Sequence, residues 1–195
     1  RIDDLEQYSR VDDVIITGLN VQTQSYAQSA SITGERNEFA ASDQKDTLEE
    51  QAISFLQKRE IPIPTEAIST CHQLPSTKST KNIIIRFANR KYKEHLLRQW
   101  KKLKGTNVSV NEHLTQNNAR LAYIARVLKK EGKITSTWTR SCKVFIKWKQ
   151  AGIEKDTITK ITMEKDFTEC NISPEYMNTL QYIIYLPGIK IKCSW

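Results

Sequence analysis

The chain has 195 residues, of which 38% are hydrophobic and 27% are charged, and its formal net charge is +8. This length suits one good domain or two small ones, and no apolar run approaches the roughly 18–20 residues that a membrane-spanning helix needs. The four cysteines lie far apart without a Cys-x-x-Cys pair, which disfavours a disulfide framework or a zinc site and favours reduced thiols inside a cell.

The positive charge is concentrated in the middle of the sequence. Residues 67–149 hold 19 Lys and Arg against 3 Asp and Glu, a net charge of +16, whereas residues 1–66 carry −7 and residues 150–195 carry −1. A block of one sign repels itself unless a polyanion offsets it, and nucleic acid is the obvious polyanion. The central block is therefore the first candidate for a binding surface.

The N-terminal third predicts a helix, a strand and a long loop. Residues 1–10 place Ile2 and Leu5 three apart among charged residues, which fits the end of a coiled-coil helix, with a short capping helix as the alternative. The β-branched run at 13–19 predicts a strand that ends near a glycine. Residues 20–45 are polar with few aliphatic side chains, so we expect a flexible insertion.

Five further elements follow up to residue 110. The spacing of apolar residues predicts a helix over 46–60, which the prolines of "IPIP" end. Strands are predicted at 67–74 and at 82–88. A helix should run from about Arg90 to Gly105, and a short strand should reach residue 110.

The helix predicted over 90–105 carries most of the cations of this region. Tyr92, Leu96, Trp100 and Leu103 share one stripe, which we expect to be buried. Seven cations surround that stripe: Arg90, Lys91, Lys93, Arg98, Lys101, Lys102 and Lys104.

Residues 11–110 therefore read β-α-β-β-α-β. This order is the ferredoxin-like arrangement, which is also that of the RRM, so the predicted fold class is α+β with a four-stranded antiparallel sheet and two helices. Alternation along 82–88 turns Ile83, Ile85 and Phe87 to one face and Arg86 to the other. That outer face lacks the aromatic residues of the usual RRM motif, so it is a poor platform for stacked bases.

A smaller basic domain is predicted at 111–149. It consists of a helix over about 115–130 and a hairpin that turns near Ser141, and it should lean on the first unit because a helix and a hairpin bury little by themselves. Trp138, Phe145 and Trp148 of the hairpin either stack on bases or pack in the core. Residues 150–195 form a divergent tail with strand-like patches at 180–186 and 189–193.

Catalytic and metal-binding motifs are not evident. The phosphate-loop, dinucleotide-binding and His-Glu-x-x-His patterns are missing, and the central block holds only three carboxylates. Cys71-His72 has no second pair to complete a zinc site, and Glu112-His113 reads as a surface cap or turn. We therefore predict no catalytic residues, no metal, no cofactor and no enzymatic activity.

Binding of a polyanion is the better prediction, because three successive elements are basic and nearly free of acids. Phosphate contacts need Lys and Arg on a face that the strand can reach, and we expect a cationic cleft between the two basic regions. The candidate nucleic-acid-binding residues are Arg86, Arg90, Lys91, Lys93, Arg98, Lys101, Lys102, Lys104, Arg120, Arg126, Lys129, Lys130, Lys133, Arg140, Lys143 and Lys147.

Three stretches resemble the first-open-reading-frame protein of LINE-type retrotransposons over roughly residues 1–149. They are "RIDDLEQYSRVDDVIITGL", the RRM-like unit, and "NEHLT" followed by a helix and a W-x(6)-F-I-K hairpin; this last stretch is also similar to the C-terminal domain of the baculovirus FP protein. The chain departs from the family in holding only a short piece of coiled coil and in its tail after residue 150.

The resemblance implies a non-enzymatic protein of a retrotransposon ribonucleoprotein. It would bind single-stranded RNA with little sequence preference, act as a nucleic-acid chaperone, trimerise through an upstream coiled coil, and reside in the cytoplasm or nucleus. The matching basic positions are Arg86, the 90–104 face, Arg120, Arg126 and Lys143. The alternatives are a protein-interaction module whose basic face binds an acidic partner, and a nuclease acting on the same substrate.

Overall fold

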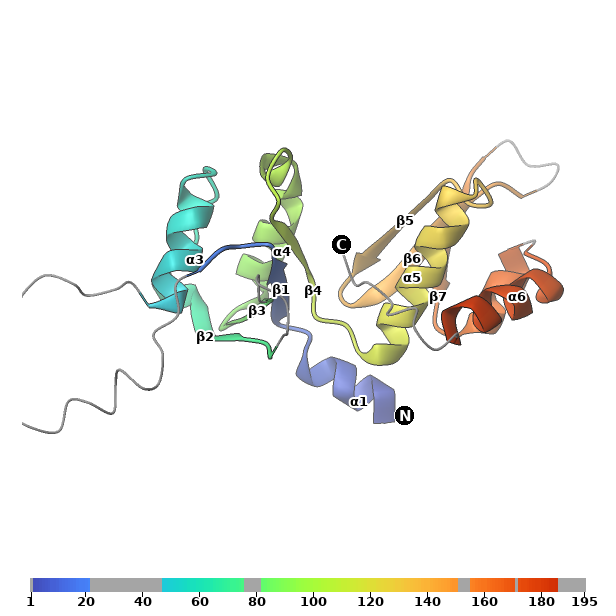
Figure 1. Cartoon of the computed structure of the whole chain (residues 1–195), viewed down its shortest axis with the longest axis horizontal. Coiled ribbons are helices and arrows are strands. Elements are labelled where there is room, and N and C mark those ends of the chain that lie inside the picture. The colour runs from blue at the N-terminus through green and yellow to red at the C-terminus, as the bar shows by residue number, and fades with distance from the viewer. Residues whose placement is uncertain (1, 22–46, 76–81, 151–154, 171, 186–195) are drawn as a thin grey trace, which may run out of the picture. The chain divides into compact units, whose positions relative to one another are not determined.

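The structure is a computed structural model that describes residues 2–21, 47–75, 82–150, 155–170 and 172–185, without side chains for 181–185 (Figure 1). The chain divides into two compact units. We call residues 12–111 the four-stranded unit. Residues 1–11 together with 112–194 make the second, which we call the three-stranded unit.

The four-stranded unit is built on a sheet of order β2-β3-β1-β4, in which β3 pairs antiparallel with β1 and β2. Its strands are β1 (Asp13–Thr17), β2 (Ile68–Gln73), β3 (Ile83–Phe87) and β4 (Ser109–Glu112). The predicted α+β class with a four-stranded antiparallel sheet is confirmed, and each predicted strand of this region lies within about two residues of its expected place.

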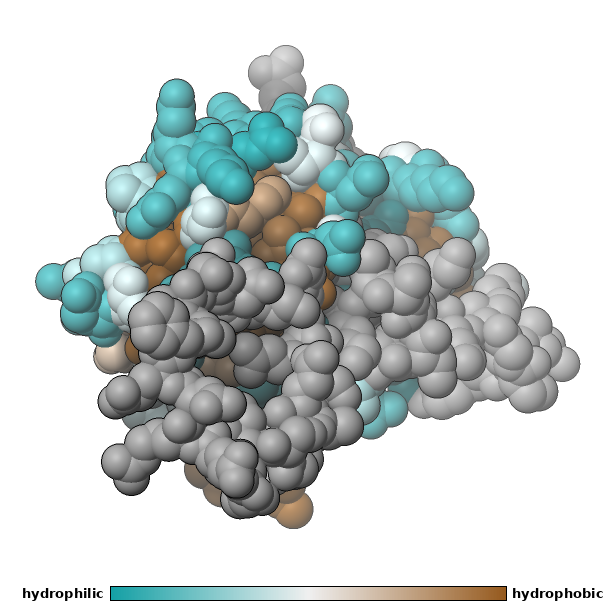
Figure 2. Space-filling view, turned by 60° about the vertical axis from the view of Figure 1, so that its left-hand side comes forward, coloured by the Kyte–Doolittle hydropathy of each residue, from teal (hydrophilic) through white to brown (hydrophobic). Residues whose placement is uncertain are grey.

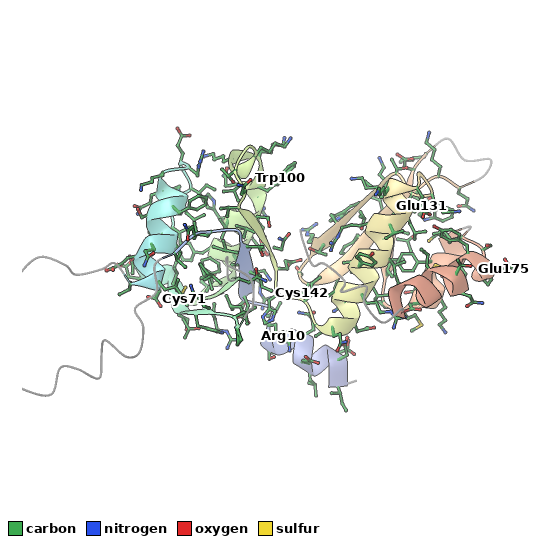
Figure 3. The ribbon with its side chains drawn as sticks, viewed as in Figure 1. Arg10, Cys71, Trp100, Glu131, Cys142 and Glu175 are labelled. Atoms are coloured by element: carbon green, nitrogen blue, oxygen red, sulfur yellow. The ribbon has the colours of Figure 1, made fainter. Side chains whose placement is uncertain are left out.

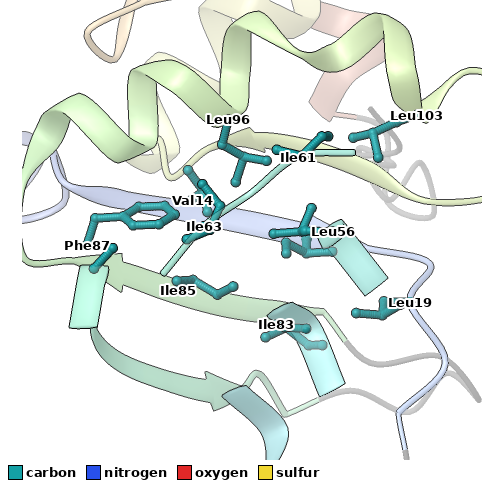
Figure 4. Packing of buried hydrophobic residues seen from close by; sticks show 13 residues of the cluster. Val14, Leu19, Leu56, Ile61, Ile63, Ile83, Ile85, Phe87, Leu96 and Leu103 are labelled. Atoms are coloured by element: carbon teal, nitrogen blue, oxygen red, sulfur yellow. The ribbon is translucent and has the colours of Figure 1, made fainter. Parts of the chain in front are cut away.

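One face of this sheet forms the core with two helices, α3 (Leu48–Gln57) and α4 (Arg90–Arg98). Figure 4 shows Val14, Ile85 and Phe87 of the strands below Leu96 of α4, as the predicted alternation requires. A short 3₁₀ turn, η1 (Thr65–Ala67), precedes β2. Ile61 and Ile63 of "IPIP" are fully buried as well, so this segment fills the core in addition to ending the helix.

Gly18 directly follows β1, at a position where a residue with a side chain would not fit. Its φ is +86°, a left-handed conformation, and an added Cβ would come within 2.0 Å of the Asn107 carbonyl oxygen. The close approach of the two backbones explains the glycine in "ITGL".

The helix predicted over 90–105 is shorter than expected. It ends at Arg98 and is followed by a 3₁₀ turn, η2 (Trp100–Leu103). Leu96 and Leu103 are buried as predicted, but Tyr92 is 37% and Trp100 52% exposed. Residues spaced i, i+4 and i+8 turn gradually around an α-helix and do not stay on one face. The inward face of α4 instead follows i, i+3 and i+4 from Lys93, which is only 2% exposed.

The three-stranded unit contains the predicted helix and hairpin and continues beyond them. Its elements are α1 (Ile2–Ser9), α5 (Gln116–Lys130), β5 (Ser136–Arg140), β6 (Lys143–Trp148), β7 (Thr157–Ile161), η3 (Glu164–Cys170) and α6 (Pro174–Tyr185). β7 pairs antiparallel with β6, giving the order β5-β6-β7. The sequence prediction missed this third strand.

The strand-like patch predicted at 180–186 is wrong over residues 180–185, which belong to α6. Ser173, whose side chain accepts a hydrogen bond from the Tyr176 N–H, and Pro174 start a helix there. Met177 and Leu180 are buried at helical spacing. The patch predicted at 189–193 lies outside the described residues.

The core of the three-stranded unit lies on one side of its sheet. α5 packs on β5 and β6, and Leu121, Ile124 and Leu128 of the helix are fully buried, as are Val144 and Ile146 of β6.

Two polar contacts hold the later elements against α5 and the turn after it. The Arg120 guanidinium contacts the Glu164 carboxylate of η3 at 2.6 Å, and the Lys133 ammonium lies 3.9 Å from the centroid of the Tyr176 ring of α6. The segment expected to be a divergent tail therefore contributes a strand and two helical elements to this unit.

Helix α1 is fixed to the start of α5 by one buried glutamine. The Gln7 side-chain oxygen accepts hydrogen bonds from the Thr115 N–H and the Asn118 amide, both at 2.9 Å, and its amide donates to the His113 carbonyl at 3.0 Å. Arg10 (labelled in Figure 3) donates to the Leu114 carbonyl. The residues of "NEHLT" thus form the docking point of the N-terminal helix.

Replacing Gln7 by Ala should lower the free energy of unfolding of the three-stranded unit by about 1–3 kcal/mol, because buried polar groups of the α5 N-terminus lose their partner. Urea unfolding followed by tryptophan fluorescence, to which the buried Trp148 of this unit contributes, measures this. The control is Tyr8→Ala, since Tyr8 is 75% exposed on the same helix and its loss should change stability by under about 0.5 kcal/mol. Equal effects of the two substitutions would contradict the docking role of Gln7.

Candidate nucleic-acid interface

The sheet of the three-stranded unit has a second face, directed away from its core. Val144, Ile146 and Trp148 of β6 point to the core, so the alternate residues of β6 point to the other side. Cross-strand register extends that side to the neighbouring strands, because residues directly opposite one another share a face. We call it the platform face, formed by Ser136, Trp138, Arg140, Lys143, Phe145, Lys147, Ile158 and Lys160.

Two aromatic rings lie at the centre of the platform face. Trp138 of β5 is opposite Phe145 of β6, with ring centroids 5.9 Å apart and planes 11° from parallel. Both side chains are partly exposed. Trp148 belongs instead to the core, where its indole N–H donates to the Thr159 hydroxyl at 3.0 Å. Of the three hairpin aromatics, Trp148 therefore packs in the core, whereas Trp138 and Phe145 are partly exposed on the platform face.

The parallel rings lie too close together to form a slot for a base. A base inserted between two rings needs roughly 7 Å, since stacked layers are about 3.4 Å apart, and the 5.9 Å centroid separation is smaller. A base that stacks on this pair would therefore use an outer ring surface and not the space between the rings.

Cations surround the aromatic pair on three sides. Arg140 lies opposite Lys143 at the hairpin end, Lys160 lies opposite Phe145 on β7, and Lys147 lies one register step further along β6. Lys147 contacts the Asp156 carboxylate at 2.6 Å. Among the described residues, none forms an ion pair with Arg140, Lys143 or Lys160.

Lys160 and the 59% exposed Ile158 were missed by the sequence analysis because β7 was missed. A signal was available: "TITKI" alternates, with Thr157, Thr159 and Ile161 on one side and Ile158 and Lys160 on the other. That period of two marks a strand.

The corresponding face of the four-stranded sheet is different. Arg86 lies there as predicted, but its guanidinium donates to both carboxylate oxygens of Asp13, at 2.6 and 3.0 Å. The hydrogen bond and the charge of Asp13 raise the pKa of Arg86 above its usual value. Ile84 is buried on this face as well. Among the described residues of β1, β2 and β3, this face therefore offers no unpaired Lys or Arg and no exposed Phe, Tyr or Trp, and its one exposed ring is the imidazole of His72.

Other predicted cations of this unit also have partners. Arg90 contacts Asp12 at 3.0 Å, so both acids of the "DD" at the start of β1 hold arginines. Arg98 contacts Glu94 on its own helix at 3.3 Å. Lys93 is buried and interacts inside the protein, so its predicted role at the surface is wrong.

η2 and the residue after it keep exposed cations. Lys101 of η2 and Lys104, which follows η2, are exposed, and the Lys104 ammonium lies 4.9 Å from the ring centroid of exposed Trp100. Trp100 is labelled in Figure 3. Lys102 donates to the Glu60 carbonyl at 2.7 Å, while Lys91 of α4 is exposed. Hydrophilic side chains also gather at the top of the space-filling view, above a hydrophobic strip (Figure 2).

The predicted cations of α5 do not join the platform face. Arg120 is held by Glu164, and Arg126 is half-buried with a partner inside the protein. Lys129 and Lys130 are exposed at the end of the helix, and Lys133 stacks on Tyr176. The platform face thus gathers three of the predicted cations, Arg140, Lys143 and Lys147, with the two aromatic residues.

The residues considered as metal ligands or catalysts are held apart or used structurally. Cys71 lies opposite Ile85 on the core face, while His72 points the other way. Burial, with a contribution from Glu49, raises the pKa of Cys71 to about 12, which disfavours the thiolate that a ligand or nucleophile needs. Glu112 is buried and accepts a hydrogen bond from the Cys142 N–H at 2.9 Å, so it anchors the hairpin turn and is not a surface cap.

No group of three or more His, Cys, Asp or Glu that could hold a metal lies together within the described residues. In the same part of the chain, no helix has both the length and the apolar character to cross a bilayer. No family model matches the chain, and no curated protein matches it either.

Replacing Arg86 by Gln should mainly affect folding. The free energy of unfolding should fall by about 1–3 kcal/mol, less than for a fully buried pair because Arg86 is half exposed, whereas oligonucleotide affinity should change less than twofold. Urea unfolding and fluorescence anisotropy measure the two effects. The double variant Asp13→Asn with Arg86→Gln should lose less stability, since no buried charge remains. A tenfold loss of affinity at unchanged stability would contradict this structural role.

Proposed function

We propose that the chain binds single-stranded nucleic acid, RNA in the first place, with little sequence preference. The observation that carries the proposal is the parallel Trp138–Phe145 pair at the centre of a face whose free charges are cationic. Stacking supplies roughly 1–3 kcal/mol per base and accepts any base, because every base has a π-face. Phosphate contacts supply the rest of the binding free energy, and this part depends on salt.

Single strands fit this face better than duplexes do. In a duplex the π-faces of the bases are already stacked on their neighbours, so the aromatic pair gains nothing from it and only phosphate contacts remain. Preferential binding of unpaired strands lowers the free energy of melted relative to paired nucleic acid by mass action. We propose that this preference is the basis of a nucleic-acid chaperone activity.

We further propose that the four-stranded unit is an RRM-like domain and that the chain derives from the first-open-reading-frame protein of a LINE-type element. The strand order β2-β3-β1-β4 with two helices on one face supports the RRM-like assignment. Exposed Ile2 and Leu5 on α1 support a coiled-coil continuation and hence self-association. In this proposal the RRM-like unit contributes charge, and the three-stranded unit contributes stacking together with the cations of the platform face.

Trp138→Ala and Phe145→Ala should each weaken binding of a fluorescein-labelled U10 oligonucleotide by about 5–100-fold, because each removes a stacking surface. Anisotropy titrations at three salt concentrations should show an unchanged slope of log K against log salt, since no cation is lost. Tyr8→Ala, which removes an exposed aromatic residue of α1, is the matched control and should bind like the wild type. Wild-type affinity of both platform variants would refute stacking on this pair.

Charge reversal at Lys101, Lys102 and Lys104 together should weaken U10 binding at least tenfold and flatten its salt dependence, because η2 then repels phosphates. The same titrations measure it, with Lys58→Glu, an exposed lysine after α3, as a single-charge control. Poly-glutamate serves as a competitor: if it displaces U10 as well as unlabelled RNA of equal charge does, the surface is a general binder of acidic polymers. That result would favour an acidic protein partner.

A further inference from the structure

We propose that Arg140 and Lys143 form a phosphate clamp at the end of the β5–β6 hairpin, beside the aromatic pair. The inference rests on the proposed function and assigns a specific subsite to it. The two residues are directly opposite in the register, and both are exposed. Side chains at opposite positions of a hairpin start about 5 Å apart, so one phosphate group can contact both cations.

The charge arrangement at this position is unusual for this protein. Like charges directly opposite one another destabilise a hairpin. Among the arginines in the described part of the chain, Arg140 alone makes no ion pair, hydrogen bond or ring contact; the others pair with acids, lie over a ring or have a partner inside the protein. Two cations held opposite one another without an acid gain from contact with an external anion, because it offsets their repulsion.

The hairpin turn holds the two cations in place. Ser141 and Cys142 form the two-residue turn, with φ of 52° and 59°, the left-handed pair that such turns need. The Cys142 N–H donates to the buried Glu112 carboxylate, which fixes the turn to the body of the unit. The repulsion between Arg140 and Lys143 is therefore not relieved by opening of the strands, and little backbone order has to be gained when an anion binds.

The spacing to the aromatic pair selects a nucleotide as the ligand. The Trp138–Phe145 pair is the next pair on the same face, two residues along, which is roughly 7 Å at 3.3–3.4 Å per residue. One extended nucleotide spans such a distance between its base and a phosphate. The Arg guanidinium supplies two parallel N–H donors to phosphate oxygens and the lysine adds a point charge.

The clamp makes a prediction that separates it from a merely basic surface, because the same repulsion links stability to binding. Lys143→Glu turns the repelling pair into an attracting one. In the absence of nucleic acid and at low salt, the unfolding temperature of the full chain should rise by about 2–5 °C. Affinity for U10 should fall at least tenfold, and the slope of log K against log salt should become shallower by roughly 0.7, the value of one phosphate contact on a single strand.

Three further variants complete the experiment, which uses thermal unfolding and anisotropy on the full chain. Arg140→Glu should reproduce both effects, whereas the double variant Arg140→Glu with Lys143→Glu should bind as weakly but lose the gain in unfolding temperature, because two carboxylates now face each other. Lys165→Glu on η3, an exposed lysine outside the platform face, controls for net charge and should change affinity less than twofold.

The measurements on these variants separate failure of the clamp from failure of the proposed function. If Lys143→Glu lowers the unfolding temperature, or if its affinity matches that of Lys165→Glu, the clamp is overturned. If Trp138→Ala still weakens binding in that case, the proposed function survives without the clamp. If the wild type does not bind U10 at low salt, both the clamp and the proposed function fail.

Discussion

The alternation of side chains along three paired strands is the constraint on which the candidate interface depends. In β6 the fully buried Val144 and Ile146 face α5, and this fixes Lys143, Phe145 and Lys147 on the opposite side. A slip of one residue in the register would exchange the two sets and expose the core. The core therefore determines where the aromatic pair and its cations lie, and the platform face is a consequence of packing on the other side.

On the four-stranded sheet, the same alternation produces an outer face whose arginine is already paired with an acid. Its outer side carries Arg86 from β3, but β1 places Asp13 directly opposite. The guanidinium and the carboxylate form two hydrogen bonds and neutralise each other. Satisfied pairs of this kind stabilise a fold and leave little charge for a ligand. Counting cations in a sequence thus overestimates a binding surface, whereas their cross-strand partners decide which cations remain available.

Much of the fold was predictable, because β-branched runs and apolar periodicity are local signals that packing reinforces. The predicted hairpin and the strand at 82–88 are examples, and both match the structure closely. The predictions of secondary structure and burial failed where tertiary packing overrides a local sequence pattern. Lys93 occupies an inward position that the sequence favours for Tyr92, and residues 180–185 are helical although their isoleucines and tyrosines suit a strand. Ion pairs such as Arg120–Glu164 join residues 44 positions apart and leave no local trace.

The balance of stacking and charge determines what the platform face can distinguish. Stacking requires an unpaired base but is indifferent to its identity, and it is independent of salt; phosphate contacts require only a polyanion and weaken as salt rises. A face with cations alone would therefore accept duplexes and acidic proteins. A face with aromatic rings alone would bind too weakly to hold a long strand at physiological salt. Trp138 and Phe145 lie one register step from Arg140 and Lys143, so in the proposed function both requirements would act on the same nucleotide. Unpaired nucleic acid is the polymer whose chemistry meets both requirements together.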